Sequence, residues 1–170
     1  MHIAIFGTGY VGLVTGTCFA EMGHTVTCVD VNEKKIEKLN QGIIPIYEPG
    51  LKELVIRNKE SKRLFFTTSY EIALNKAEVC FIAVPTPSAD DGSCDLSYVV
   101  ECSKLIAKNL KSSIVVINKS TSPVKTGDLI EKVIKWFILG NFLLQLDHHQ
   151  NFFQNLDIHD LGDDSLYHDY

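Results

Sequence analysis

Three glycines near the start of the chain constrain its fold more than any other feature. Gly7, Gly9 and Gly12 have the G-x-G-x-x-G spacing and separate an apolar run at residues 2–6 from a helical segment at residues 13–23. Between a strand and a helix, this spacing predicts a turn that binds a dinucleotide, with a turn that binds nothing as the alternative. Gly7 permits the tight turn, Gly9 lets a diphosphate approach the backbone, and Gly12 lets the helix pack on the sheet. The helix N-terminus then offers free N–H groups to the phosphates.

Apolar runs and helical segments alternate through the rest of residues 1–136. We expect further strands at 24–30, 63–69, 78–84 and 113–119, and helices at 32–42, 51–60, 70–77, 96–110 and 122–136. The strands are apolar throughout rather than at every second residue, which is typical of a parallel sheet covered on both faces. The sequence therefore predicts one doubly wound, Rossmann-like α/β domain with a three-layer αβα architecture.

The composition argues against several classes of partner. The net charge of −5 gives no basic excess for nucleic acid. The apolar run at 136–146 is shorter than the roughly 20 residues that span a membrane, and the N-terminus lacks the features of a signal peptide. The five cysteines show no metal-type spacing, and Cys18, Cys28 and Cys80 lie in apolar segments where a free cysteine acts as a small hydrophobic residue. We therefore expect a reduced, cytoplasmic protein without a metal site.

Asp30 ends the second expected strand, 18 residues after Gly12. An acid at this position accepts hydrogen bonds from the adenosine ribose of a dinucleotide, and its charge favours NAD over NADP. An N-cap for the following helix is the alternative role of Asp30. Lys35 lies further along the same helix, where it either belongs to this site or is a solvated surface charge.

Two threonines follow later strands at the edge where parallel α/β sheets bind ligands. Thr86 lies in the V-P-T-P segment after residues 78–84, and Thr121 lies in the K-S-T-S-P segment after residues 113–119. Their short hydroxyl groups suit a ribose or a carboxamide. A role in turns or caps is the alternative for both.

Three segments, at residues 3–51, 81–99 and 118–128, resemble the motifs of the UDP-glucose/GDP-mannose dehydrogenase family, in the right order and at the right distances. The resemblance covers residues 1–136, and the P-I-Y-E-P-G-L segment at 45–51 favours the UDP-glucose branch. It implies an NAD-binding domain from an enzyme that oxidises UDP-glucose to UDP-glucuronate, with two hydrides transferred to NAD.

The resemblance also implies roles for individual residues near the glycine turn. Val11, Asp30 and Lys35 match family positions that hold the adenosine half of NAD. Tyr10 matches a position at the cofactor site on the side of the sugar nucleotide. These residues join Gly7, Gly9 and Gly12 as the expected cofactor contacts.

The motif around Thr121 matches the family less closely. Thr86 and Thr121 match positions beside the ribose and nicotinamide end of NAD, and Thr121 also matches a threonine that assists catalysis by ordering water or substrate. The family pattern S-T-V-P-x-G has its valine replaced by Ser122 and its glycine by Lys125. We expect Ser122 to lose an apolar contact and Lys125 to add charge near the nicotinamide pocket.

The family nucleophile, a cysteine of the second domain, has no counterpart in these 170 residues. Cys94 lies in a polar loop beside Asp90, Asp91 and Asp95, whose charges disfavour a thiolate, so we expect an incidental thiol. The next strand of the family and its sugar-nucleotide domain are also missing. We therefore expect a sheet that is incomplete at its C-terminal side, in a truncated chain that forms homo-oligomers only with the missing parts.

These absences leave a choice of function. The first is the UDP-glucose-oxidising enzyme, with this chain as its NAD-binding part. The second is a fragment that binds NAD but has no activity. A third, a dehydrogenase of the 6-phosphogluconate or hydroxyacid type, is disfavoured by residues 45–51 and 91–99.

The charge distribution changes abruptly at residue 137. Residues 1–136 contain all 16 basic residues and 15 of the 21 acidic residues, whereas residues 137–170 contain six Asp and no Lys or Arg. We therefore expect an atypical tail at 137–170, read from a shifted frame, derived from a truncated gene, or disordered. The tail also contains four histidines, whose irregular spacing does not predict a metal site.

Overall fold

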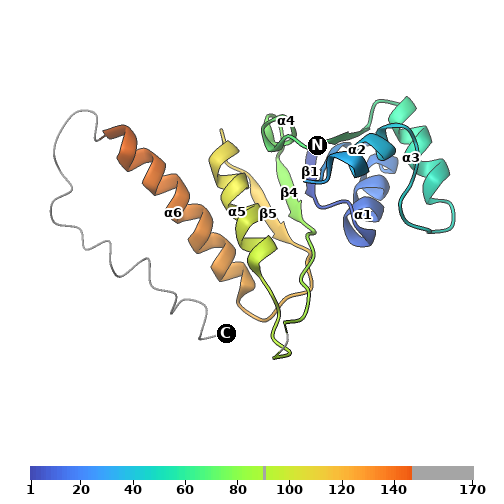
Figure 1. The fold of residues 1–170 in the computed structure, drawn as a ribbon. Coiled ribbons are helices and arrows are strands. Elements are labelled where there is room, and N and C mark those ends of the chain that lie inside the picture. Colours follow the sequence, from blue (N-terminus) through green and yellow to red (C-terminus); the bar gives the residue numbers. More distant parts are fainter. Residues whose placement is uncertain (90, 147–170) are drawn as a thin grey trace.

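The computed structural model describes residues 1–89 and 91–146, with side chains as far as residue 140. It contains a five-stranded parallel sheet with the order β3-β2-β1-β4-β5. Figure 1 shows β1 and β4 near the middle of the molecule. The strands are β1 (His2–Phe6), β2 (Thr25–Val29), β3 (Leu64–Thr67), β4 (Val79–Ile82) and β5 (Val115–Asn118). The strand order reverses between β1 and β4, which is where doubly wound sheets bind ligands.

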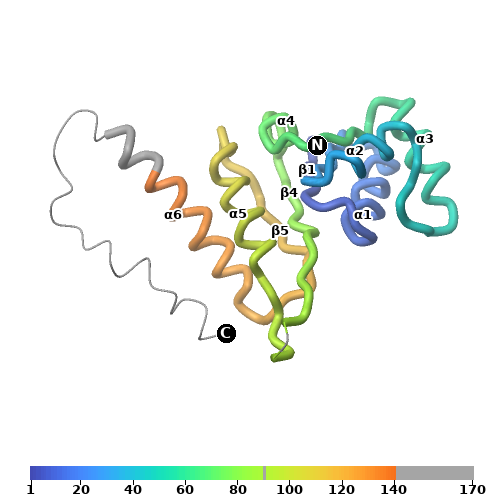
Figure 2. Tube along the Cα trace, in the orientation of Figure 1, coloured from blue at the N-terminus to red at the C-terminus, as the bar shows by residue number. Residues whose placement is uncertain are grey.

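Six helices accompany these strands in the described part of the chain, and the last of them follows β5. They are α1 (Tyr10–Glu21), α2 (Glu33–Asn40), α3 (Leu51–Glu60), α4 (Tyr70–Leu74), α5 (Ser97–Asn109) and α6 (Thr126–Leu146). The trace in Figure 2 passes from α5 through β5 into α6. Helices α5 and α6 pack side by side. Each strand and helix predicted from the sequence is present.

Two apolar layers hold the helices against the sheet. Ile5 and Cys28 face α1, α2 and α3, and are fully buried. Phe6 and Ile82 face the opposite side, where they pack with buried residues of α5 such as Ile106. Figure 1 shows α1, α2 and α3 on one side of the sheet and α5 and α6 on the other. The three-layer αβα arrangement is thus confirmed.

The last helix differs from the sequence prediction at both ends. It begins at Thr126 rather than near Pro123, because the Thr126 backbone N–H and hydroxyl both donate to the Pro123 carbonyl, at 3.3 and 2.8 Å. It continues to Leu146, so the proposed boundary after residue 136 falls within α6 and stays a prediction. The residues from 147 onward lie outside the described part.

Two further observations concern exposure. Cys28 and Cys80 are buried as expected for small hydrophobic residues, but Cys18 is exposed, because it lies on the outer face of α1. On the edge strand β5, Val115 and Ile117 are 58% and 38% exposed. No helix within residues 1–89 and 91–146 is both long enough and apolar enough to cross a membrane.

Candidate dinucleotide-binding site

A cavity of about 450 Å³ opens at the carboxyl ends of β1, β2, β4 and β5. Eight of the nine cofactor contacts predicted from the sequence line it, namely Gly7, Gly9, Tyr10, Val11, Asp30, Lys35, Thr86 and Thr121. The cavity therefore brings together residues from four separate segments of the chain at the point where the strand order reverses. The ninth residue, Gly12, does not line the cavity and instead packs against Gly7 and Ala83.

Gly7 and Gly12 are required by the packing of the turn itself. Gly7 has a φ of +101°, and a Cβ there would lie 2.2 Å from the Ala83 carbonyl oxygen. A Cβ on Gly12 would lie 1.9 Å from the Gly7 carbonyl oxygen and 3.3 Å from the Ala83 Cβ. The two distances to backbone oxygens, 2.2 Å at Gly7 and 1.9 Å at Gly12, are too short for any side chain. These two glycines therefore let α1 pack close to β1 and β4.

Gly9 differs from Gly7 and Gly12, because the described residues leave space for a side chain at this position. A Cβ on Gly9 would have no heavy atom within 4 Å, and its φ of −75° is open to any residue. The fold itself therefore does not require glycine at this position. The backbone is bare where it borders the cavity, and that leaves room for a ligand to approach it.

The start of α1, at Tyr10 and Val11, borders this open space. No side chain caps the helix, and its first turn contains no acidic residue. The first N–H groups of a helix have no partner within the helix, and the helix dipole favours a negative charge there. The turn thus has the geometry and the electrostatics of a phosphate site.

Asp30 lies just after β2 and faces the glycine turn. Its Oδ2 accepts hydrogen bonds from the Thr8 backbone N–H at 3.0 Å, the Thr8 hydroxyl at 2.6 Å and the Lys35 Nζ at 2.7 Å. Its Oδ1 accepts one from the Asn32 backbone N–H at 3.1 Å. The side chain of Asp30 is 12% exposed and that of Lys35 is 27% exposed. Lys35 is therefore paired with Asp30 rather than being a solvated surface charge.

The cap of α2 is Asn32, whose side chain accepts from the Lys35 backbone N–H at 3.1 Å. This leaves the Asp30 carboxylate available to the cavity. Partial burial raises the pKa of Asp30, but the hydrogen bonds from Lys35, Thr8 and Asn32 outweigh burial and hold that pKa below its ordinary value. Asp30 is consequently ionised at neutral pH.

Thr86 and Thr121 lie where the main cavity joins a second one of about 290 Å³. Ser120 fixes the loop that contains Thr121, because its hydroxyl donates to the Val84 carbonyl at 2.8 Å. The Asn118 amide donates to the Ser122 hydroxyl at 2.9 Å. Ser122 therefore has a polar partner in place of the apolar contact that a valine would make.

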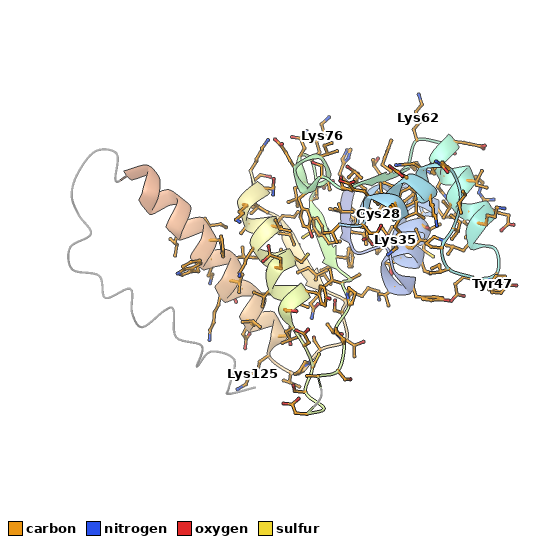
Figure 3. The ribbon with its side chains drawn as sticks, viewed as in Figure 1. Cys28, Lys35, Tyr47, Lys62, Lys76 and Lys125 are labelled. Carbon is orange, nitrogen blue, oxygen red and sulfur yellow. The ribbon has the colours of Figure 1, made fainter. Side chains whose placement is uncertain are left out.

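Lys125 precedes α6, and its expected charge near the nicotinamide pocket stays a prediction. It lines neither cavity, and Figure 3 shows it far from Lys35, beyond the start of α6. Its φ of +74° lies in the left-handed region that favours glycine. The glycine that the family usually has at this position is thus explained by the backbone rather than by the pocket.

Cys94 lies in the second cavity and is partly buried. Its Sγ lies 3.9 Å from the Thr121 carbonyl oxygen, and no basic residue lines that cavity. The carboxylates of Asp91 and Asp95 accept hydrogen bonds from backbone N–H groups of Ser93 and Ser97. Among the described residues, this cavity therefore offers no basic side chain to Cys94, which agrees with the incidental role predicted for it.

Several residues that line the main cavity were not foreseen from the sequence. Tyr98, Glu101, Cys102 and Leu105 form one stripe along α5 with the spacing i, i+3, i+4, i+7. This stripe lies beside the buried residues of α5, so helical spacing within the predicted helix 96–110 was the available signal. Burial raises the pKa of the Cys102 thiol to about 12, so this group is neutral.

Tyr70 also lines the cavity, and its ring stacks on Phe6 at a centroid distance of 4.6 Å. Burial raises the pKa of the Tyr70 hydroxyl, so it is neutral as well. Thr8, another lining residue that was not foreseen, is fully buried. Among the described residues there is no group of three His, Cys, Asp or Glu side chains that suits a metal ion, and the four tail histidines lie outside them.

A sequence model described as "UDP-glucose/GDP-mannose dehydrogenase family, NAD binding domain" matches residues 1–147. The chain belongs to this family. The family assignment agrees with the open glycine turn, the Asp30 carboxylate and the cavity between them. It establishes NAD as the cofactor of the domain.

Curated relatives include UDP-glucose 6-dehydrogenase YwqF of Bacillus subtilis, which is 50% identical over 134 residues. The UDP-glucose 6-dehydrogenase of Rhizobium meliloti is 52% identical over 136 residues. Each alignment covers 79% of this chain but only 30% and 31% of the relative. The chain thus spans about a third of the length of the relatives that it matches.

Solved structures show the same fold. A ternary complex of GDP-mannose dehydrogenase from Pseudomonas aeruginosa superposes with a TM-score of 0.77 at 38% identity, covering 81% of this chain and 32% of that one. A UDP-glucose dehydrogenase from Pyrobaculum islandicum gives a TM-score of 0.76 at 38% identity, covering 81% and 33%. These chains act on different sugar nucleotides, so the shared fold does not by itself decide the substrate.

Proposed function

We propose that this chain supplies the NAD-binding domain of an NAD-dependent dehydrogenase that oxidises UDP-glucose to UDP-glucuronate. The observation that carries the proposal is the Asp30 carboxylate, ionised and held against the glycine turn beside an open cavity. Two curated relatives about 50% identical to it are UDP-glucose 6-dehydrogenases, and residues 45–51 favour the same substrate.

NAD fits the residues that are present. The bare backbone at Gly9 and the uncapped start of α1 suit the diphosphate, with Tyr10 and Val11 beside it. Asp30 and Lys35 suit the hydroxyl groups of the adenosine ribose. Thr86 and Thr121 lie at the opposite end of the cavity, where their hydroxyls suit the second ribose and the nicotinamide amide.

When bound, NAD supplies the hydride acceptor of the reaction. Oxidation of the C6 alcohol to an aldehyde releases one hydride and one proton. Oxidation of the aldehyde to a carboxylate consumes one water and releases a second hydride and two protons. This chain contributes the orientation of the acceptor, and Thr121 lies where a hydroxyl is able to order water or the substrate.

A second candidate is an NAD-binding fragment without activity, and the charge on Asp30 does not distinguish the two. The observation in its favour is coverage, because the chain spans about 30% of its relatives. Two cysteines line these cavities among the described residues: Cys94, whose cavity has no basic residue in its described lining, and Cys102, whose pKa burial raises to about 12. We propose that residues 1–170 alone bind NAD weakly and do not oxidise UDP-glucose.

An absorbance assay for NADH with the purified chain, NAD and UDP-glucose tests this proposal. We expect NAD binding in a parallel titration and no NADH formation that depends on UDP-glucose. Sustained turnover would show that residues 1–170 suffice for catalysis. Failure to bind NAD at all would refute the cofactor site.

The remaining expectations follow the family. We propose a cytoplasmic protein with neither nucleic acid nor membrane as partner. We also propose that it forms homo-oligomers only through segments that its relatives have beyond the part matched here.

A further inference from the structure

We propose that Thr8 is a positioning residue, which fixes the Asp30 carboxylate so that its Oδ1 atom receives the 2′-hydroxyl of the adenosine ribose. The proposal rests on the seating of NAD given above. It adds a residue that lies at the variable first x of the G-x-G-x-x-G turn and that does not itself need to touch the cofactor.

The donors around Asp30 are distributed unevenly between its two oxygens. Oδ2 accepts three hydrogen bonds, two from Thr8 and one from Lys35, whereas Oδ1 accepts one, from the Asn32 backbone N–H. A carboxylate oxygen has about two lone-pair sites. Within the described residues Oδ2 is therefore saturated, and the free acceptor site is on Oδ1.

Thr8 is the residue that fixes this choice. It is fully buried, so its hydroxyl has no access to solvent and keeps one partner. Its hydroxyl and its backbone N–H both donate to the same oxygen, at 2.6 and 3.0 Å, which clamps the carboxylate from the side of the turn. Lys35 alone is a flexible point donor and is less able to fix an orientation.

The consequence is a preset acceptor for the ribose. The Asp30 side chain is 12% exposed, and the oxygen that remains open belongs to a group lining the cavity. A carboxylate whose orientation is fixed before binding loses little conformational freedom when a ligand hydroxyl arrives. Without the Thr8 hydroxyl, Asp30 turns toward Lys35 and presents its oxygens to the ribose less well.

The experiment compares two ligands on each variant. Dissociation constants are measured for NAD and for its 2′-deoxy analogue, which lacks the 2′-hydroxyl of the adenosine ribose. Each ligand is titrated into the wild-type chain and into the variants Thr8→Val, Thr8→Ala and Thr8→Ser. Thr17→Val is the matched control, because Thr17 is equally buried, its hydroxyl donates to a backbone carbonyl at 2.7 Å, and it does not line the cavity. The ratio of the two constants cancels any general loss of binding.

We expect the wild-type chain to bind NAD at least about tenfold more tightly than the deoxy form, since a hydrogen bond to a charged group is stronger than one between neutral groups. Thr8→Val and Thr8→Ala reduce that ratio to about threefold or less, because the acceptor is no longer fixed. Thr8→Ser restores it, and Thr17→Val leaves it unchanged. Thermal melting establishes that each variant is folded.

Several results would overturn the positioning role. These are an unchanged ratio in Thr8→Val and Thr8→Ala, a failure of Thr8→Ser to restore it, or a loss of the folded state in both hydroxyl-free variants. A wild-type chain that binds both ligands equally would remove Asp30 as the acceptor but leave NAD binding intact. A wild-type chain that binds neither would refute the proposed function itself.

Discussion

Replacing Gly9 by valine separates what the ligand needs from what the fold needs. A Cβ at Gly9 has no heavy atom within 4 Å, and φ is −75°, so the folded chain accepts a side chain there. We expect the free energy of unfolding to change by less than about 0.5 kcal/mol, or to rise slightly, because glycine is more flexible in the unfolded state.

The effect of Gly9→Val on NAD binding is expected to be large. The added side chain occupies the space from which a diphosphate reaches the N–H groups at the start of α1. Losing two charge-assisted hydrogen bonds costs about 3 kcal/mol or more, which corresponds to a factor of over 100 in the dissociation constant.

Gly12→Ala is the matched control, because its Cβ would lie 1.9 Å from the Gly7 carbonyl oxygen. Moving the backbone to relieve this contact costs at least about 1–3 kcal/mol of stability. Thermal unfolding followed by circular dichroism measures stability, and calorimetric titration measures NAD binding. A Gly9→Val variant that binds NAD as the wild type does would refute the placement of the diphosphate.

Three further predictions concern Asp30 and Lys125. Asp30→Ala should weaken NAD binding by roughly 1.5–3 kcal/mol in a calorimetric titration and reduce the preference over NADP, because Lys35 is then free to pair with a 2′-phosphate. Hydrogen bonds lower the pKa of Asp30, so its contribution to NAD binding is present at neutral pH and is lost as the pH falls through that lowered pKa. In the same titration repeated at decreasing pH, Asp30→Asn should remove this acid-dependent loss of NAD affinity. Lys125→Gly should stabilise the chain by about 0.5–1 kcal/mol in chemical denaturation, because φ is +74°, whereas Lys132→Gly within α6 should destabilise it by about 1 kcal/mol.

The sequence predicted the fold well because the relevant signals are local. Each apolar run expected to be a strand within residues 1–136 is a strand, and the glycine spacing together with its context located the turn and Asp30. The alternation of strands and helices was enough to predict parallel pairing. No comparable local signal gives the order of the strands, which depends on contacts between residues far apart in the chain.

What the sequence did not predict depends on three-dimensional contacts. Thr8 occupies a position that the motif leaves free, and its two hydrogen bonds to Asp30 span 22 residues. The cavity stripe on α5, which includes Tyr98 and Leu105, mixes polar and apolar residues, so hydrophobicity alone did not identify it. The left-handed backbone of Lys125 was also not evident from its residue type.

The central claim is that NAD binds with its diphosphate against the start of α1 and its adenosine ribose against Asp30. Calorimetric titration of the unmodified chain with NAD, and separately with NADP, tests this claim most directly. We predict saturable binding of NAD, with NADP at least about tenfold weaker because the Asp30 carboxylate repels a 2′-phosphate. Absence of NAD binding by a folded chain, or equal affinity for the two dinucleotides, would contradict it.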